Sequence, residues 1–448
     1  MNWLRPRQAA VTWVAGILLA ACALFMTELS RSSGHLAAIR GAAYIGLTIA
    51  GVWGSVLLWN RNDRNALLVM IAAAVLARAA LLPATPSLSH DAFRYMWDGR
   101  LLRHGVDPYV APPNDPSLHA FRNDWLYAYI DWNTVPTLYP PVDLALFALA
   151  DILDDKNTLA IKLLVEVGDL ATLSLLIILL RRRNLPIGRA AVYAWSPLVI
   201  TELAYSGHEE AWCLAALLLA ISLTERTRTR LGACVLAVAA LVKLYPIALY
   251  PAFFPRKSAQ PYAIGAALIV AAYAPFYFWH PRVLGFLPAF VAHERFNDTL
   301  SAFASPPAAA ALLGLAVIVS FIARRRGAPL VGTVIFIELA YLALSPNVYP
   351  WYVTIFSALV PLVPGAFVGR MQPLSVGLLG WTLTAPLAYG NGRLYAPDSS
   401  IGTIVKAVEY APVAVGIVIY SLSFLRPKIW PDAFARKGAL HSDSAAGS

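Results

Sequence analysis

Apolar runs separated by short polar stretches fill this chain almost from end to end. Most of the runs approach the roughly 20 residues that an α-helix needs to cross the hydrocarbon core of a bilayer. This pattern predicts an all-α, polytopic membrane protein with about twelve spans. The predicted spans are residues 9–29, 41–59, 66–82, 158–180, 189–206, 210–224, 261–279, 308–323, 329–345, 350–367, 374–390 and 403–425.

Basic residues at the ends of these runs predict how the chain is oriented. Short cytoplasmic loops of membrane proteins carry an excess of Lys and Arg. When Arg5 and Arg7 are placed in the cytoplasm, the other basic clusters between the spans fall on the same side. The remaining polar stretches then face outside, and they are residues 83–157, 206–210, 280–307, 345–350 and 390–402.

Composition supports the membrane interpretation and removes other classes of protein. The 448 residues are 59% hydrophobic and 13% charged, whereas ordinary soluble domains are roughly 25% charged. The net charge of +10 comes from short basic runs beside apolar segments, so nucleic acid is not a predicted partner. The three cysteines lie inside apolar segments, which predicts neither disulfides nor a metal cluster. No metal ion and no cofactor are predicted.

One apparent targeting signal needs an interpretation. Residues 19–22 read LAAC and resemble the lipidation box of bacterial lipoproteins. The apolar run continues past Cys22, however, so the whole stretch is long enough to span a bilayer. We therefore predict an uncleaved first helix.

The stretch from about 231 to 254 differs from the other apolar runs. Both of its flanks are basic, it is too short for two crossings, and Lys243 and Pro246 lie near its middle. A proline breaks a helix, and irregular backbone at membrane depth persists only where protein or a water-filled cavity covers it. We predict a re-entrant helix pair whose tip carries Lys243. Since an intramembrane lysine is costly, it indicates a function, although a snorkelling lysine near a helix end is the alternative.

The outer segments bring together the residues from which a catalytic site is built. If a helix starts after Ser89, Asp91, Arg94, Tyr95 and Asp98 lie on one of its faces. The alternative is a charged interfacial helix whose ion pairs merely neutralise one another. Further polar residues come from the turn SGHEE at 206–210 and from HERFND at 293–298.

Carboxylates beside cations favour transfer chemistry, because a general base and positive charges for a leaving group are then available together. Asp91 is the predicted base, and Lys243, Arg295 and Arg94 are the predicted cations. No GxxxxGK, HExxH, GxSxG or CxxC pattern occurs, which argues against nucleotide, zinc and serine hydrolase chemistry.

Several of these segments together resemble a known class of enzymes. They are DAFRYMWDGRLLRHGVDPY (91–109), TLYPPVDLALFAL (137–149), TELAYSGHEEAW (201–212), LVKLYPIALYPAF (241–253), ERFND (294–298), NVYPWY (347–352) and KAVEYAP (406–412). The set resembles polyprenol-phosphate-sugar-dependent glycosyltransferases of the GT-C class. It is most similar to the bacterial alpha-mannosyltransferases of the phosphatidylinositol-mannoside type, which are like glycosyltransferase family 87.

The resemblance implies a GT-C-like bundle in which Asp91 is the catalytic base and the K-x-Y-P motif carries Lys243 and Tyr245. The predicted residues that bind the donor phosphate or lipid are Lys243, Tyr245, Arg295, Arg94 and His208. The predicted substrate-binding residues are His90, Tyr95, Trp97, Glu209, Asp298, Tyr139 and Trp351. Trp97 and Tyr95 are expected to offer aromatic faces to a sugar ring.

The implied domains are an extra N-terminal transmembrane pair at 1–60, a catalytic membrane domain at 61–426 that includes the outer loop 83–157, and a disordered cytoplasmic tail at 427–448. Within the loop, the short apolar stretch 140–153 is expected at the membrane interface. The extra pair departs from the class, in which the acidic loop usually follows the first span.

The function implied is an inverting transfer of a sugar, mannose being the expected one, from a polyprenyl phosphate to a hydroxyl of a glycolipid or glycan acceptor. The reaction is expected on the outer face of the inner membrane of a bacterium, among membrane lipids. A glycan polymerase or ligase with a diphosphate-lipid donor, and a lipid or sugar transporter, are the alternatives.

Overall fold

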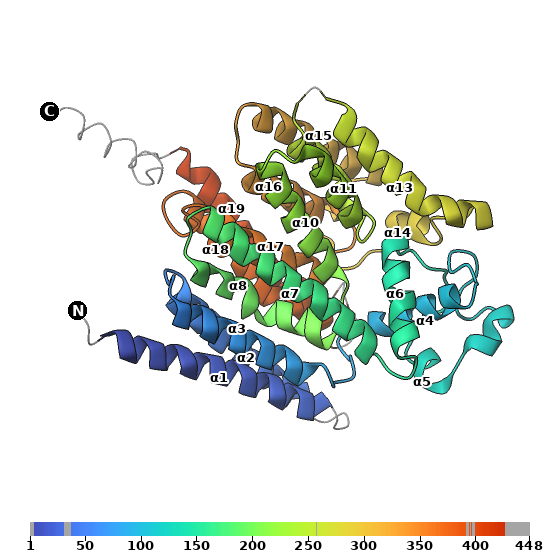
Figure 1. Ribbon diagram of the computed structural model, residues 1–448, viewed down its shortest axis with the longest axis horizontal. Helices are drawn as coiled ribbons and strands as arrows, with labels where there is room; N and C mark the ends of the chain where they lie inside the picture. Colours follow the sequence, from blue (N-terminus) through green and yellow to red (C-terminus); the bar gives the residue numbers. More distant parts are fainter. Residues whose placement is uncertain are drawn as a thin grey trace.

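The computed structural model describes residues 4–30, 37–256, 258–390, 394, 396 and 399–425. Every regular element in these ranges is a helix, apart from an isolated bridge between Phe296 and Asn347. The predicted all-α class is therefore confirmed (Figure 1). Parts of the predicted outer segment 390–402, and the whole tail 427–448, lie outside the described residues.

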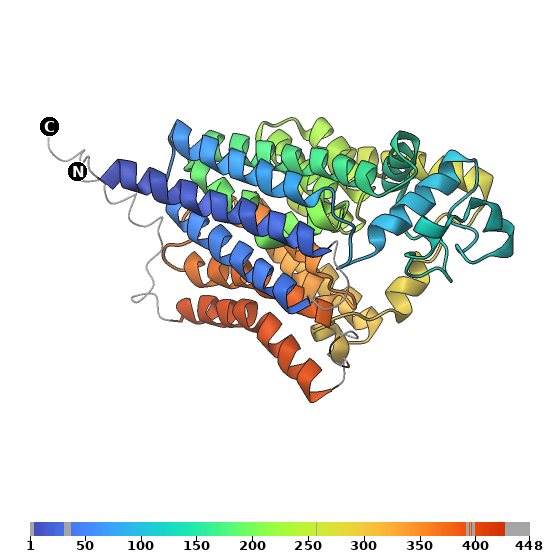
Figure 2. The same ribbon diagram turned by 90° about the horizontal axis from the view of Figure 1, so that it is seen from below.

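Three N-terminal helices form a layer along one side of the bundle (Figures 1 and 2). They are α1 (Leu4–Ser30), α2 (Ala37–Leu58) and α3 (Arg64–Leu81). Asp63 caps α3, since its side chain accepts the Ala66 N–H at 3.0 Å. The buried Arg78 of α3 forms an ion pair with Asp169 and donates to the Ala194 carbonyl at 2.8 Å. These contacts tie the N-terminal layer to the centre of the bundle.

The long segment 83–157 folds into a compact helical unit at one end of the bundle (Figure 1). Its elements are α4 (Asp91–Arg103), η1 (Pro116–Phe121), α5 (Asp124–Tyr127) and α6 (Pro141–Leu153). Helices α4 and α6 approach closely at Gly99, which has no side chain. A Cβ at this position would lie 2.2 Å from the Phe147 carbonyl oxygen. Arg100 and Arg103 of α4 both bind Asp151 of α6, at 3.3 and 3.1 Å. The short apolar stretch 140–153 is therefore a helix packed on α4.

A single helix does not form where a span was predicted at 189–206. After α7 (Leu159–Arg182), this stretch contains η2 (Ile187–Ala190), α8 (Ala191–Ala194), α9 (Pro197–Val199) and η3 (Ile200–Tyr205). Pro197 has no N–H to donate, and the Ser196 hydroxyl accepts the Val199 N–H at 3.3 Å, so the helix restarts there. The last turn, η3, is a π-helix and leads into the turn that carries His208.

The break predicted near Lys243 is present. The elements in this region are α10 (Glu210–Glu225), α11 (Thr229–Ala240), η4 (Tyr245–Leu249) and α12 (Tyr250–Phe253). Helix α11 ends at Ala240, and Lys243 lies in the connection to η4, whose second residue is Pro246. The proline begins a new helical turn here instead of continuing the old one.

The C-terminal half completes the bundle. Its elements are α13 (Gln260–Trp279), α14 (Leu287–His293), η5 (Leu300–Phe303), α15 (Pro306–Arg325), α16 (Leu330–Leu344), η6 (Pro350–Val353), α17 (Thr354–Leu359), η7 (Val360–Leu362), α18 (Met371–Thr384), η8 (Ala385–Gly390) and α19 (Ser400–Ser423).

Six helices in the described ranges are long and apolar enough to cross a membrane, which supports membrane character. They are Gly41–Leu58, Arg64–Leu81, Leu159–Arg182, Gln260–Trp279, Pro306–Arg325 and Ser400–Ser423. Of the residues in the apolar spans of α13 and α15, 11% are buried, whereas 50% of those in the span of α7 are buried. Helices α13 and α15 therefore present most of their apolar surface outward, as lipid-facing helices do.

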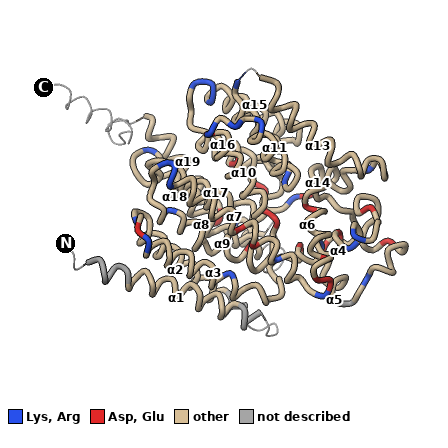
Figure 3. The backbone as a smooth tube through the Cα atoms, in the orientation of Figure 1, with Lys and Arg blue, Asp and Glu red and all other residues tan. Residues whose placement is uncertain are grey.

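Charged residues separate along the bundle. Several acidic residues gather around α4, α6 and the start of α10 (Figure 3). A separate basic group contains Arg183, which pairs with Glu225 and donates to the Leu362 carbonyl, and Arg189, which donates to the Val363 carbonyl. The acidic residues predicted for the outer site and the arginines predicted to face the cytoplasm therefore lie in different parts of the fold.

Candidate active site

A cavity of 290 Å³ lies between the start of α4 and the central bundle. Its walls come from segments that are far apart in the sequence. Asp91, Arg94, Tyr139, Lys243 and Trp351 all line it, so five of the residues predicted for the site face one space.

Lys162 of α7 fixes the chain that leads to this cavity. Its ammonium donates to the carbonyl oxygens of Leu81 and Leu82, both at 2.9 Å, and of Ala84 at 2.8 Å. The Leu81 and Leu82 carbonyls lie at the C-terminal end of α3, where a cation is favourable, and the Ala84 carbonyl follows two residues later. The segment that carries Asp91 therefore starts from a firmly held point.

Asp91 is the first residue of α4 and its carboxylate is 24% exposed. Its backbone N–H donates to the Ser89 hydroxyl at 3.2 Å, while His90, rather than the expected Ser89, holds the cap position. Burial, together with the negative charge of Glu209, raises the pKa of Asp91 to about 7. A carboxylate with such a pKa is matched to general-base work near neutral pH.

His208 lies behind Asp91 with its ring fully buried. Its Nδ1 is 3.6 Å from Asp91 Oδ2 and 3.4 Å from the Tyr95 hydroxyl. On the other side, Nε2 is 3.4 Å from Glu202 Oε2, and the ring stacks on Trp351 with centroids 3.8 Å apart. Burial and the nearby Lys243 charge lower the pKa of His208 well below its usual range. His208 thus bridges two carboxylates, an arrangement that its predicted role at a phosphate did not anticipate.

Glu202 was not predicted as a site residue, although an acidic residue inside an apolar run was a signal that pointed to it. It is fully buried in η3 and accepts a hydrogen bond from the Tyr389 hydroxyl at 2.7 Å. Tyr389 itself lines the cavity. Asp91, His208, Glu202 and Tyr389 thus form a row of polar groups that begins and ends at the cavity.

Lys243 projects from the helix break toward two adjacent glutamates. Its Nζ is 2.5 Å from Glu209 Oε1 and 2.9 Å from Glu210 Oε1. The ammonium also lies 6.0 Å from the ring centre of Tyr139 and 5.5 Å from that of Tyr352. One cation therefore faces two carboxylates and two aromatic rings at the cavity wall.

Two further buried groups surround this ion cluster. Asp143 of α6 is fully buried, and neither of its carboxylate oxygens has a hydrogen-bond partner within the described residues. Tyr245 accepts a hydrogen bond from the Cys213 thiol at 3.3 Å and stacks on Tyr341 with centroids 5.4 Å apart. Tyr245 thus packs behind the helix break, and it is absent from the lining of the cavity.

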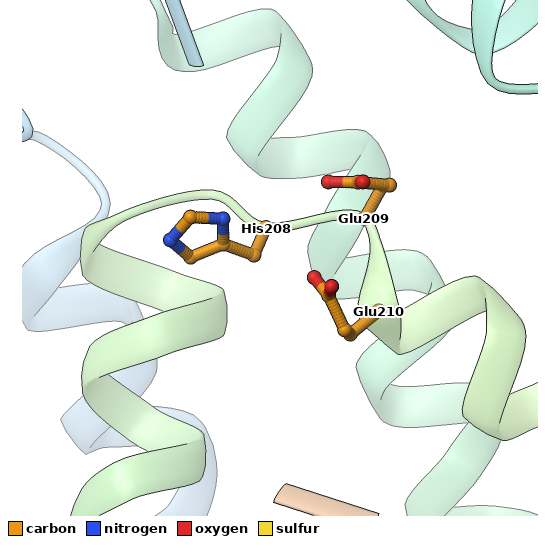
Figure 4. Close-up of side chains that lie close together, drawn as sticks. All are labelled: His208, Glu209 and Glu210. Atoms are coloured by element: carbon orange, nitrogen blue, oxygen red, sulfur yellow. The ribbon is translucent and has the colours of Figure 1, made fainter. Parts of the chain in front are cut away.

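His208, Glu209 and Glu210 are residue types that hold metal ions in other proteins, and their polar atoms lie within 4.8 Å of one another (Figure 4). In this site, however, the Lys243 ammonium already contacts both glutamates. The positive charge that faces this cluster is therefore a side chain of the protein.

Arg94 is held by the protein rather than free to orient Asp91. Its guanidinium donates to Asp98 at 3.0 and 3.1 Å and to the Trp132 carbonyl at 2.9 Å. Asp98 also accepts the Thr137 hydroxyl proton at 2.7 Å. Arg94 and Asp98 therefore anchor the loop over the cavity, although the Arg94 side chain still lines it.

The two rings expected to hold a sugar pack inside the protein. Trp97 is fully buried, with its ring 6.1 Å from that of Tyr127, and it does not line the cavity. Tyr95 is also buried and stacks on Phe147 at 4.4 Å. Sequence spacing placed both on α4, but Tyr95 packs on Phe147 of α6 and Trp97 lies beside Tyr127 of α5.

Arg295 and Asp298 lie beside a neighbouring space. Arg295 is 48% exposed and pairs with Asp298 at 3.1 Å, and Lys406 reaches the same carboxylate at 3.1 Å. Arg295 lines a second cavity, of 230 Å³, which shares Phe290 and Tyr352 with the first. The structure therefore places Arg295 next to the central site and not inside it.

Residues of the loop 131–136 complete the cavity and were not predicted. Asp131 is 55% exposed and its Oδ2 is 3.2 Å from Nδ1 of His90, a predicted substrate-binding residue. Trp132 is 49% exposed and also lines the cavity. No periodic pattern marks this loop, so the sequence carried little signal for it.

Comparison with known proteins supports the resemblance that the motifs showed. Residues 8–255, more than half of the chain, match the family described as Alpha-(1->6)-mannopyranosyltransferase, N-terminal domain. The chain is also similar to alpha-(1->6)-mannopyranosyltransferase A of Mycobacterium tuberculosis, at 28% identity over 205 residues. That match covers 43% of this chain and 39% of the length of the relative. Asp91, His208 and Lys243 lie within the range matched by the family, whereas Trp351 lies beyond it.

Proposed function

Because the chain belongs to the alpha-(1->6)-mannopyranosyltransferase family, we propose that it is an inverting membrane glycosyltransferase that uses a polyprenyl-phosphate mannose donor. The acceptor is a hydroxyl of a lipid-linked or free glycan. The family membership confirms the expected mannosyltransferase resemblance of the GT-C type, and the donor, the acceptor and the side of the membrane are our proposal.

The observation that carries this proposal is that Asp91 and Lys243 line the same cavity although 152 positions separate them in the sequence. Transfer from a sugar phosphate needs a proton acceptor on one side of the sugar and a cation for the leaving phosphate on the other. The cavity supplies one group of each kind, and aromatic rings line the space around them.

The reaction follows from these groups as a single displacement. The acceptor hydroxyl oxygen attacks the anomeric carbon, and the bond from that carbon to the phosphate oxygen breaks through an oxocarbenium-like state. The hydroxyl proton moves to the Asp91 carboxylate, and the electron pair of the broken bond leaves with polyprenyl phosphate. Attack from the face opposite the phosphate inverts the anomeric configuration.

His208 and Glu202 support Asp91 in this scheme. A neutral imidazole has one N–H, yet carboxylate oxygens lie 3.6 Å from Nδ1 and 3.4 Å from Nε2. The imidazole therefore lies between the two carboxylates and positions the Asp91 carboxylate for the proton transfer. Trp351 fixes the imidazole plane by stacking on it.

Lys243 stabilises the leaving phosphate by its positive charge. Its side chain lines the cavity and forms ion pairs with Glu209 and Glu210 at 2.5 and 2.9 Å. The two carboxylates hold the ammonium at the cavity wall, where its charge is available to an anionic donor.

The second cavity gives the donor lipid a route from the bilayer. Most of its lining residues are apolar and come from α14, α15 and α16, and the charged Arg295 lines it as well. It meets the central cavity at Phe290 and Tyr352. Because α15 faces outward, a polyprenyl chain can lie here while its phosphate points toward Lys243.

The proposed topology follows the basic residues. The Arg-rich helix ends face the cytoplasm, the cavity faces the periplasm of a bacterial inner membrane, and about twelve segments cross the bilayer. Residues 1–60 then form a peripheral helix pair beside a catalytic domain at 61–426.

Reconstitution of the purified protein in lipid, with radiolabelled polyprenyl-phosphate mannose and a membrane extract, tests the proposal. Label should move to an extractable glycolipid or glycan with inverted anomeric configuration. Protein that accepts no polyprenyl-phosphate sugar, but transfers glycans from a diphosphate lipid or moves lipid across the bilayer, would show that the proposal is wrong.

A further inference from the structure

Trp132 stands out among the residues that line the central cavity. Its indole is 49% exposed and lines the same space as the Asp91 carboxylate. The tryptophan expected to hold a sugar, Trp97, is fully buried instead. An exposed aromatic ring is therefore available at the site, but it comes from a different element.

The backbone at Trp132 is held in an unusual conformation. Its φ angle is 60°, in the left-handed region that bulky residues rarely adopt. Its carbonyl accepts hydrogen bonds from Arg94 Nη1 at 2.9 Å and from the Val135 N–H at 3.3 Å. The next residue, Asn133, accepts the Asn114 N–H at 2.9 Å. Such strain persists only where the surroundings enforce it, and it gathers at ligand sites.

A ring presented in this way differs from an ordinary surface tryptophan. Its backbone is already ordered before any ligand arrives, so binding costs little further conformational entropy. A large aromatic face with a few polar groups beside it is what small-molecule sites use. A polar group of this kind is present, since Asp131 is 55% exposed and lines the cavity together with Trp132.

We infer that Trp132, together with Asp131, forms the subsite that binds a pyranose ring of the acceptor. The apolar C–H face of the sugar stacks on the indole, and its hydroxyls donate hydrogen bonds to the Asp131 carboxylate. The acceptor is then a glycan whose sugar is recognised, and not a bare lipid headgroup. This inference rests on the proposed function.

The positions of the lining residues favour this division of the cavity. Phe290 and Tyr352 also line the second cavity, which is apolar and suits the donor lipid. Trp132 is 49% exposed and Asp131 is 55% exposed, so a substrate that arrives from water can reach both. The competing interpretation is that Trp132 is an anchor in the interfacial aromatic belt of membrane proteins.

The test measures steady-state kinetics of the full chain in lipid nanodiscs. The donor is polyprenyl-phosphate mannose, and the acceptor is an octyl glycoside of an α-(1→6)-linked mannose disaccharide. Trp132→Asn removes the ring, and Asn tolerates the left-handed backbone. Trp132→Phe restores an aromatic face. Trp279→Asn is the matched control, because Trp279 is 47% exposed and lies outside both cavities.

We expect Trp132→Asn to raise the acceptor KM about tenfold, which corresponds to about 1.4 kcal/mol. The donor KM should stay unchanged, Trp132→Phe should recover most of the loss, and Trp279→Asn should behave as wild type. An unchanged acceptor KM overturns the inference. So does a rise in donor KM without a rise in acceptor KM, which indicates a lipid anchor.

A binding measurement separates this inference from the proposed function. Isothermal titration calorimetry of the disaccharide glycoside needs no transfer reaction. If wild type transfers no mannose but binds the disaccharide, and Trp132→Asn binds it about tenfold more weakly, the proposed function fails and the subsite stands. Equal affinity of both proteins for the disaccharide overturns the subsite whatever the activity.

Discussion

Replacing Asp91 by Asn removes a proton acceptor while it preserves the size and most polar contacts of the side chain. The Asp91 backbone N–H donates to the Ser89 hydroxyl, and this hydrogen bond survives the change because it does not use the side chain of residue 91. An amide also fits beside His208 Nδ1, which lies 3.6 Å from the carboxylate. The substitution therefore isolates basicity from shape.

The magnitude follows from the role and the surroundings of the carboxylate. General bases contribute roughly 10²- to 10⁴-fold, or about 3 to 5 kcal/mol of activation free energy. Moving the pKa from 3.8 to about 7 means that the fold disfavours the ionised carboxylate by about 4 kcal/mol. Because the neutral form is the one that the fold prefers, Asp91→Asn should unfold at the same temperature as wild type or a higher one.

The assay is single-turnover transfer of labelled mannose in nanodiscs at saturating donor, measured from pH 5.5 to 8.5. We expect the wild-type rate to rise through about pH 7 and then level off, because only the deprotonated Asp91 acts as a base, and to fall about tenfold per pH unit below. Asp91→Asn should be at least about 100-fold slower, with no such step. Asp155→Asn, an exposed carboxylate of the same outer segment, is the control.

A rate for Asp91→Asn within a few fold of wild type would refute the reasoning. The base would then have to be sought at Asp131, the other carboxylate that lines the cavity. A slow variant that keeps the wild-type pH step would refute it as well, because the step would then belong to another group.

Three further predictions concern other parts of the site and fold. Lys243→Met should raise the donor KM about tenfold or more, since a charge-assisted contact of roughly 1.5 to 3 kcal/mol is lost; an unchanged donor KM would contradict the role of Lys243 at the phosphate. Lys162→Met should lower the midpoint of thermal unfolding, because the carbonyls of Leu81, Leu82 and Ala84 each lose the hydrogen bond from the ammonium. Lys162→Arg should lower it less, because it keeps a positive charge at the end of α3. Impermeant maleimide should label His293→Cys from outside in intact cells and Arg325→Cys only after permeabilisation, and the reverse labelling would invert the proposed topology.

Local chemistry predicted the parts of the site that stand out from an apolar background. Asp91 and Lys243 were predictable because charges beside or within membrane segments are costly and seldom without a role. The helix break near Lys243 was predictable for the same local reason, since Pro246 cannot continue a helix. The all-α class followed from the length and apolar character of the runs.

The remaining features depend on packing between distant segments. Trp97 looked available because it shares a helix with Asp91, but it is fully buried, with Tyr127 of α5 beside its ring. Trp132 has no marker in the sequence, because its exposure depends on how Arg94 and Asp98 hold the loop. Pro197 was a local signal that the predicted span 189–206 would be broken, and its effect was underestimated.

The π-helical turn η3 has a consequence for how this chain tolerates change. All six residues of this turn, 200–205, are buried, so their side chains are constrained by packing. The length of the turn is constrained as well, for a different reason. A π-turn contains one residue more than an α-helix would use, and each residue of a helix turns the chain by about 100°. Deleting one residue here would restore a regular helix, swing the His208 imidazole away from Asp91 and Glu202, and uncouple the row of polar groups without altering any of its members. An insertion or deletion scan across this turn would thus expose a constraint on chain length that substitution scans pass over.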